Sequence, residues 1–210
     1  MTITDGYTTQ AVMKDRFDID HTDDDDLIDL AVTSASRDID AYCQRRFHKD
    51  GSASARIFYG STRTSGLSYV LVDDFHTISG LVVKTDSSDD GTFDTTWSSD
   101  EYELHPLNGL SGGVEGWPYE RFHAVKTRTF PDGGKRARVQ ITADWGWDAV
   151  PAQVGDACQI WAGRLLRRKD SPDGIAGGFD FEPIRVSSRL DPDVMQQLAA
   201  FKKPVVARAR

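Results

Sequence analysis

A stretch of helical spacing in the last third of the chain constrains its fold most strongly. From Ala152 to Lys169 apolar residues recur every three or four positions, which predicts a helix with one apolar stripe. Pro151 fits the first turn of such a helix, where no backbone N–H is needed. Cations gather at its C-terminal end, where they face the negative pole of the helix dipole. The stripe is Val154, Ala157, Cys158, Trp161 and Leu165, and the cations are Arg164, Arg167, Arg168 and Lys169.

A second amphipathic stretch, from about Asp24 to Phe47, offers this helix a packing partner. We expect the two to form the antiparallel pair of a small helical core, preceded by a short amphipathic segment at 8–17. Thr22 and Asp25 have the spacing of a capping box, and the surrounding acidic run suits the positive end of a helix dipole. A metal site built from this acidic run is the alternative. The apolar positions are Ile28, Ala31, Ala35, Ile39, Tyr42 and Cys43.

Between these stretches, from Ala55 to Trp147, the hydrophobic period changes to two. Short apolar runs alternate with Gly-, Ser- and Asp-rich connections, which predicts a β-rich insertion. The sequence therefore predicts an α+β fold with a helical core at 1–50, the insertion at 51–147 and a closing core helix at 148–169. The predicted strands are 56–59, 69–72, 81–84, 102–104 and 137–142.

The C-terminal residues, 170–210, are rich in Gly and Pro yet carry aromatic side chains. Such a composition is poorly suited to a core but well suited to lying in a groove on another surface. Asp191 and Pro192 then open a short helix. We expect an extended arm that ends in this helix, with Val194, Met195, Leu198 and Phe201 on one side.

Composition narrows the class of protein. A chain of 210 residues with 39% hydrophobic and 28% charged residues has room for one sizeable core, or for a core plus a smaller inserted lobe. The net charge of -8 argues against a general nucleic-acid binder, which needs positive charge to displace counterions, but not against a protein that DNA passes. No apolar run is long enough to cross a bilayer and the first residues do not form a signal peptide, so we expect no membrane association. Cys43 and Cys158 are interpreted as buried free thiols, with a disulfide as the alternative.

The stretch from Asp86 to Asp94 contains half of a calcium loop. Alternate oxygens precede Gly91 at the sixth position, as in loops that wrap a hard cation. The position expected to hold a bidentate Glu is Trp97, and the flanks are predicted strands. An acidic β-hairpin turn is therefore the favoured interpretation, with a calcium turn as the alternative. The candidate calcium ligands are Asp86, Ser88, Asp90 and Asp94.

Enzyme signatures are absent from the sequence. It has no Gly-x-Ser-x-Gly elbow, no phosphate loop and no dinucleotide glycine fingerprint. The five histidines show no metal-ligand spacing with one another or with the cysteines. We expect neither catalysis nor a cofactor, although a hydrolase site assembled from scattered residues is a rival interpretation.

Two tryptophans end the β-rich region. Trp145 and Trp147 alternate along a strand end, so their rings should face opposite sides. One ring can serve the core. The other needs a cover, either a loop of the same chain or a neighbouring subunit.

The arrangement resembles the head–tail connector (adaptor) proteins of long-tailed double-stranded DNA bacteriophages. The resemblance covers most of the chain and rests on several short matches. These are the acidic lead and helix start at 23–31, the helix end at 39–47, the hairpin at 89–93, Trp145-Gly-Trp with 150–154, and the stretch 190–194.

The resemblance implies a structural virion protein without enzymatic activity. Members of this family form a ring of about twelve subunits under the portal, extend the DNA channel and present a docking surface to neck or tail proteins. It implies a location at the capsid vertex, after assembly in the host cytoplasm, with double-stranded DNA passing through without sequence-specific binding. It also assigns partner contacts to the C-terminal region, with Phe179, Phe181, Val194, Leu198 and Phe201 as the candidate residues. Trp145 and Trp147, singled out above from the sequence itself, are two further candidates for a partner contact.

Two other functions fit the same sequence. A tail-completion or stopper protein belongs to the same neck and needs similar surfaces. A calcium-assisted β-rich binding module would instead use the turn at 86–94 to recognise a surface ligand.

Overall fold

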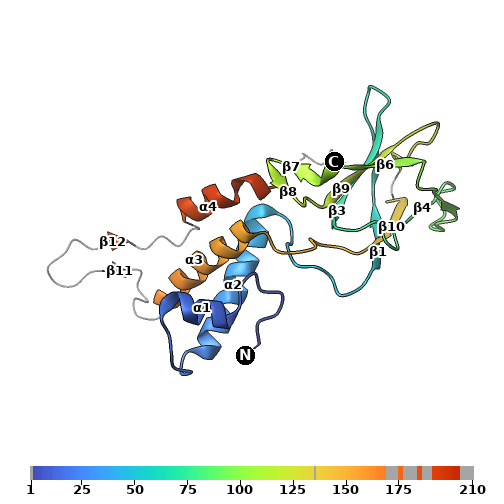
Figure 1. Cartoon of the computed structure of the whole chain (residues 1–210). Coiled ribbons are helices and arrows are strands. Elements are labelled where there is room, and N and C mark those ends of the chain that lie inside the picture. The colour runs from blue at the N-terminus through green and yellow to red at the C-terminus, as the bar shows by residue number, and fades with distance from the viewer. Residues whose placement is uncertain (1, 135, 169–174, 177–183, 186–190, 204–210) are drawn as a thin grey trace. The chain divides into compact units, whose positions relative to one another are not determined.

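The computed structural model describes residues 2–134, 136–168, 175–176, 184–185 and 191–203. Within them the chain forms helices and antiparallel sheets, so the fold is α+β (Figure 1). The helices are α1 (Gln10–Phe17), α2 (Asp25–Cys43), α3 (Ala152–Arg167) and α4 (Pro192–Leu198), with 3₁₀ turns η1 (Leu107–Gly109) and η2 (Ala199–Phe201). The strands are β1 (Ser54–Phe58), β2 (Gly60–Thr62), β3 (Ser68–Phe75), β4 (Val82–Thr85), β5 (Thr95–Thr96), β6 (Tyr102–His105), β7 (Leu110–Ser111), β8 (Val114–Glu115), β9 (Tyr119–Ala124), β10 (Val139–Ala143), β11 (Ile175–Ala176) and β12 (Ile184–Arg185).

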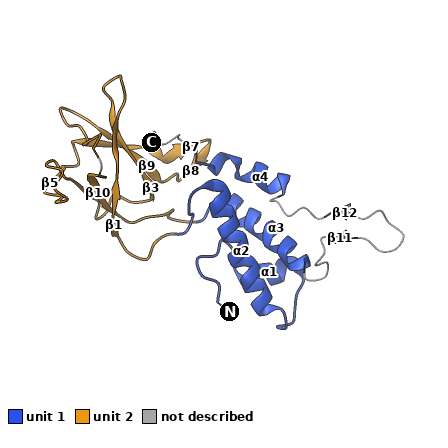
Figure 2. Ribbon diagram, turned by 180° about the vertical axis from the view of Figure 1, so that it is seen from behind, with its two compact units in different colours: residues 1–48, 150–210 blue, residues 49–149 orange. Residues whose placement is uncertain are grey.

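The chain divides into two compact units, coloured separately in Figure 2. Residues 1–48 and 150–210 make the helical unit, and residues 49–149 make the β unit. The period-two region that the sequence analysis assigned to an insertion, 51–147, falls inside the second of these. No helix in the described part of the chain combines the length and the apolar composition needed to cross a bilayer.

Helices α2 and α3 pack against each other along their apolar stripes. The Ser36 hydroxyl lies 3.4 Å from the Cys158 sulfur, and the Trp161 indole N–H donates to an Asp38 carboxylate oxygen at 2.7 Å. The predicted contact between the two amphipathic stretches is therefore present. Most of the apolar residues expected on the two stripes are buried, whereas Tyr42 and Leu165 are only partly so. The buried ones are Ile28, Ala31, Ala35, Ile39, Cys43, Val154, Ala157, Cys158 and Trp161.

The ends of α2 differ from the prediction. The helix stops at Cys43, because Gln44 takes a left-handed conformation (φ 55°) that ends the hydrogen-bond pattern, so Phe47 lies beyond it. The predicted capping box does not form. Asp24 occupies the cap position, Thr22 accepts a hydrogen bond from Asp25 N–H through its main-chain carbonyl instead of its side chain, and the Asp25 carboxylate pairs with Lys14 at 2.7 Å.

Helix α4 packs into the helical unit. Gln197 donates to Asp156 of α3 at 2.9 Å, Arg164 of α3 pairs with Asp191 at the start of α4, and Phe201 meets the ring of Phe47 edge-on at 5.7 Å. The sequence analysis placed this helix at the tip of an extended arm. Its apolar side instead helps to form the core of the helical unit.

The β unit contains two four-stranded antiparallel sheets. Their strand orders are β1-β10-β4-β5 and β2-β3-β9-β6. The inner faces meet in one apolar core, to which the first sheet contributes Val83, Val139, Ile141 and Ala143 and the second contributes Val70, Val72, Phe75 and Phe122. Trp97 and Phe130 stack inside this core with ring centroids 4.2 Å apart.

Both cysteines are buried and free, which confirms the free-thiol interpretation. Burial raises the pKa of Cys43 to about 12 and that of Cys158 to about 11. Because the thiolate is the reactive form of cysteine, both side chains serve as packing groups at neutral pH.

Candidate functional site

The two tryptophans that the sequence offered as interface residues are covered by their own chain. Trp145 and Trp147 are 1% and 2% exposed. The Trp145 indole donates to the Ser54 carbonyl at 2.8 Å, and the Trp147 indole donates to the Asp74 carboxylate at 3.0 Å. The ring of Trp117 lies edge-on to that of Trp147, with the centroids 5.0 Å apart, so a residue of the same chain covers Trp147. Their assignment to a partner surface is therefore corrected.

Three of the expected C-terminal anchors are also interior residues. Val194 and Leu198 of α4 are fully buried, and Phe201 is 1% exposed. An amphipathic pattern shows that a helix buries one side, but it does not show whether the same chain or a partner covers that side. The other two expected anchors, Phe179 and Phe181, lie outside the described residues.

In the turn between β4 and β5, carboxylate oxygens accept hydrogen bonds from backbone N–H groups of the same turn. Asp86 is buried, and its carboxylate accepts the N–H groups of Gly91 at 2.7 Å and Asp90 at 3.4 Å. Burial opposes ionisation of Asp86, but these backbone donors outweigh it and lower the pKa of that carboxyl. Gly91 takes φ +94°, which favours glycine at this corner.

Around this turn, the Asp90 carboxylate accepts the Thr92 N–H at 2.7 Å, and Ser88 donates toward Asp86 at 3.4 Å. The ligand atoms of Asp86, Asp90 and Asp94, all described, do not converge into a three-carboxylate group. The local hydrogen bonds account for these residues as an acidic hairpin turn, which was the favoured interpretation.

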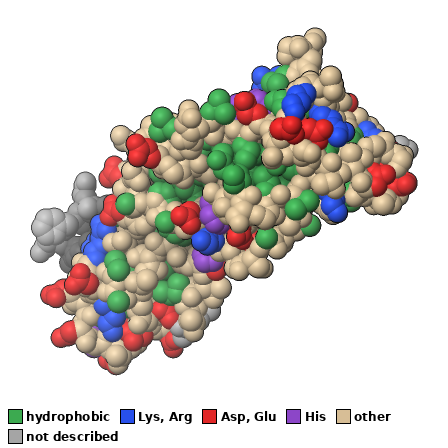
Figure 3. Space-filling view, turned by 45° about the vertical axis from the view of Figure 1, so that its right-hand side comes forward, with side chains coloured by type: hydrophobic (Ala, Val, Ile, Leu, Met, Phe, Trp, Pro, Cys, Tyr) green, Lys and Arg blue, Asp and Glu red, His purple; other side chains and the backbone are tan. Residues whose placement is uncertain are grey.

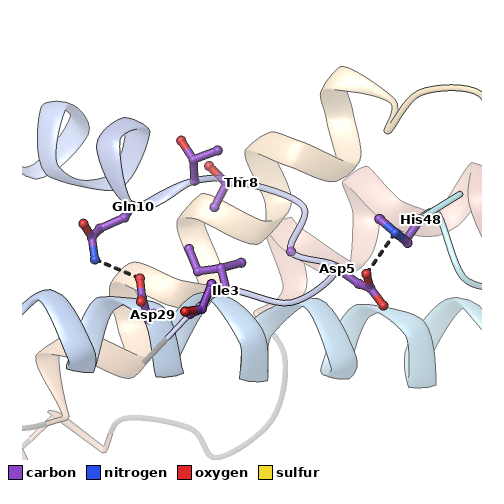
Figure 4. A pocket seen from close by; sticks show the side chains of 9 residues that line it. Ile3, Asp5, Thr8, Gln10, Asp29 and His48 are labelled. Atoms are coloured by element: carbon purple, nitrogen blue, oxygen red, sulfur yellow. Dashed lines mark hydrogen bonds and ion pairs between the residues drawn. The ribbon is translucent and has the colours of Figure 1, made fainter. Parts of the chain in front are cut away.

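A cavity of about 520 Å³ lies in the helical unit, between the N-terminal segment and α2 (Figure 4). Four of its polar side chains form two pairs: Gln10 donates to Asp29 at 2.9 Å, and Asp5 faces His48 at 2.9 Å. The buried hydroxyl of Thr8, which also lines the cavity, makes no hydrogen bond within the described residues. Arg46 also binds Asp5, at 2.8 Å. These pairs fasten the N-terminal segment to the helical unit, which is a structural task.

The outer face of one sheet of the β unit carries a cluster that sequence spacing did not reveal. Glu103 and His105 lie on β6, and His123 lies opposite Glu103 on the neighbouring strand β9. His105 Nε2 is 2.8 Å from Glu103 Oε1, and the two imidazole rings lie 3.9 Å apart. Burial, followed by the nearby charges of His105 and Arg121, lowers the pKa of His123.

Several large apolar side chains of the β unit are exposed. Ile57 and Tyr59 stand at the end of the edge strand β1 with more than half of their surface accessible. Figure 3 shows apolar side chains gathered among acidic and basic groups on one face of the molecule. Exposed apolar groups on an edge strand favour contact with another protein chain. The exposed set in this unit is Ile57, Tyr59, Leu71, Ile78, Val82, Leu107 and Leu110.

The sequence matches no protein-family model and no curated protein. Among solved structures, its fold is similar to that of a chain in a structure described as the neck of an empty GTA (gene transfer agent) particle with C6 symmetry. The TM-score is 0.56 at 15% sequence identity, and the likeness covers 100% of this chain and 96% of that chain. At this identity the likeness is one of fold. The helical unit with its β-rich insertion is therefore an architecture that a chain of a GTA neck also has.

Proposed function

We propose that this protein is a structural subunit of the neck of a phage-like particle, where it acts as the head-to-tail adaptor. The observation that carries the proposal is the fold likeness to a neck chain, which spans both proteins almost from end to end. A likeness over the full length supports a shared role better than one confined to a single common element would. The likeness includes the β-rich insertion as well as the helical unit.

Surface composition supports the same role. A ring subunit needs surfaces that bind copies of itself, and the exposed apolar side chains of the β unit are candidates for such contacts. In the cavity of the helical unit, the carboxylates of Asp29 and Asp5 are paired with Gln10 and His48, which suits a structural role better than a catalytic one. We therefore assign no catalytic role to the chain.

The proposed assembly is a ring of about twelve subunits, a number that sixfold symmetry allows. In it the portal lies on one side and the neck or tail proteins on the other, and the DNA passes through the centre. The net charge of -8 suits a channel along which phosphates slide without sticking. A strongly basic inner surface of the assembled ring would contradict this part of the proposal.

A mixing experiment with purified portal rings tests the adaptor role. The purified chain should form a stable ring-on-ring complex that elutes as one species and is visible by electron microscopy. Binding to tail proteins alone would favour the tail-completion or stopper role. Calcium calorimetry tests the remaining alternative, and we expect neither heat nor a thermal shift.

Removing residues 179–210 is too large a change to test whether Phe179 and Phe181 contact the portal. That truncation would delete Val194, Leu198 and Phe201, which are buried in the helical unit, and would damage the fold. The double substitution Phe179→Ser with Phe181→Ser leaves α4 intact and should abolish attachment to the portal. Leu30→Ser, at an exposed apolar position of α2 outside the exposed set of the β unit, is the matched control and should bind normally. Unchanged attachment of the double variant would remove these two residues from the docking surface.

A further inference from the structure

The Glu103–His105–His123 cluster is arranged by strand geometry. Successive side chains of a strand point to opposite faces, so Glu103 and His105, two positions apart on β6, share one face. The pairing of Glu103 with His123 places the second histidine on that face. The intervening pair, Leu104 with Phe122, points to the core, where Phe122 is completely buried.

The three donor groups already stand close to the spacing of metal ligands. One ligand atom from each residue lies within 4.8 Å of the other two, and His105 Nε2 is 2.8 Å from Glu103 Oε1. Around a tetrahedral ion with bonds of about 2.0–2.2 Å, neighbouring ligand atoms are about 3.3 Å apart. The cluster therefore needs side-chain shifts of no more than about 1.5 Å to surround an ion. With the Glu103 side chain half exposed, water can reach a fourth position.

The charges around the cluster define which kind of ion fits. One carboxylate and two imidazoles form a mixed oxygen and nitrogen set, which suits a divalent transition metal better than Ca²⁺ or Mg²⁺. Arg121, which pairs with His105 across the strands, adds a positive charge nearby and weakens cation binding.

We propose that Glu103, His105 and His123 form a binding site for one divalent transition-metal ion of the Zn²⁺ class. The ion displaces the proton between His105 Nε2 and Glu103 Oε1, which passes to water, and it also binds a ring nitrogen of His123. Water completes the coordination. The site would cross-link β6 to β9 on the outside of the sheet. Because a single carboxylate faces the ion beside Arg121, we expect a dissociation constant in roughly the micromolar range.

Titration of the full-length, tag-free protein with ZnCl₂ and CoCl₂ tests the site. Calorimetry should show one Zn²⁺ per chain, and Co²⁺ should give a visible absorption band of a low-symmetry four-coordinate site. His105→Gln and His123→Gln should each weaken Zn²⁺ binding by about tenfold or more and abolish the Co²⁺ band, since each removes a ligand. Two variants are used so that loss of fold in one does not decide the result.

His48→Gln is the matched control, because His48 also faces one carboxylate, Asp5 at 2.9 Å, but does so outside any three-donor group of the described residues. This variant should bind Zn²⁺ like the unaltered protein. Absence of Zn²⁺ heat and of the Co²⁺ band in the unaltered protein would overturn the proposal. So would unchanged binding in folded His105→Gln and His123→Gln variants, with thermal unfolding used to confirm their folds.

Discussion

At the residue scale, one carboxylate holds three helices of the helical unit together. Asp156 of α3 accepts a hydrogen bond from Arg16 of α1 at 2.5 Å and another from Gln197 of α4 at 2.9 Å. These two donors, Arg16 first, lower the pKa of Asp156. A carboxyl whose pKa is lower in the folded state stabilises the fold while it is ionised, above its unfolded pKa. That stabilisation is lost as the pH falls through the lowered folded pKa.

Asp156→Asn should therefore change how the free energy of unfolding depends on pH. At pH 7 the variant should lose about 0.2–1 kcal/mol of unfolding free energy, the range of a partly exposed ion pair screened by solvent. Below about pH 4 the difference from the unaltered protein should shrink, because the Asp156 carboxyl of the unfolded chain then begins to take up protons. It should vanish once the folded carboxyl, with its lower pKa, is protonated as well. Denaturant unfolding at a series of pH values measures both effects. In an Arg16→Gln background the substitution should cost less, and an equal cost would show that the pair is not coupled.

At the element scale, a glycine sets the close approach of α1 to α3. A Cβ on Gly163 would lie 2.2 Å from Cζ of Phe17, far inside contact distance. Gly155, in the same helix, has more space, since the nearest atom to its Cβ position is the Tyr7 carbonyl oxygen at 3.4 Å. Substitutions at the two glycines therefore distinguish the effect of helix packing on stability from the effect of helix propensity.

Gly163→Ala and Gly155→Ala should move stability in opposite directions. Alanine favours a helix over glycine by about 1 kcal/mol, and Gly155→Ala should gain up to that amount. At Gly163 the clash with Phe17 should outweigh the gain and cost about 1–3 kcal/mol. Thermal or urea unfolding of both variants checks this, and equal stabilisation by the two would contradict the packing of α1 on α3.

The elements themselves were partly predictable. Helices α2, α3 and α4 and five of the strands follow from their periods, because an apolar stripe or an alternating run is a local property. Helix α1 has no such stripe, and Met13 is its only buried residue. β9 was missed. Its sequence, Tyr-Glu-Arg-Phe-His-Ala, is largely polar and only Phe122 is fully buried, although the strand lies inside its sheet between β3 and β6. Without β9 in place, His123 could not be paired with Glu103, so the cluster on β6 and β9 could not be found from spacing.

At the scale of the whole molecule, the hydrophobic period changes near residues 55 and 147, close to the bounds of the β unit at residues 49 and 149. The sequence does not show whether the apolar side of each amphipathic element is covered by the same chain or by a partner. Val194, Leu198 and Phe201 were expected to meet a partner and are buried in the helical unit, and Trp145 and Trp147 are buried in the β unit. The candidates for assembly have therefore shifted to side chains that remain exposed, such as Ile57 and Tyr59.

An image of the intact particle at the tail vertex tests the central claim most directly. The proposed adaptor role predicts a closed ring of about twelve copies of this chain between the portal and the tail. Each copy should show a helical unit and a β unit. A vertex without this chain, or with the chain placed elsewhere in the particle or as a single copy, would contradict it.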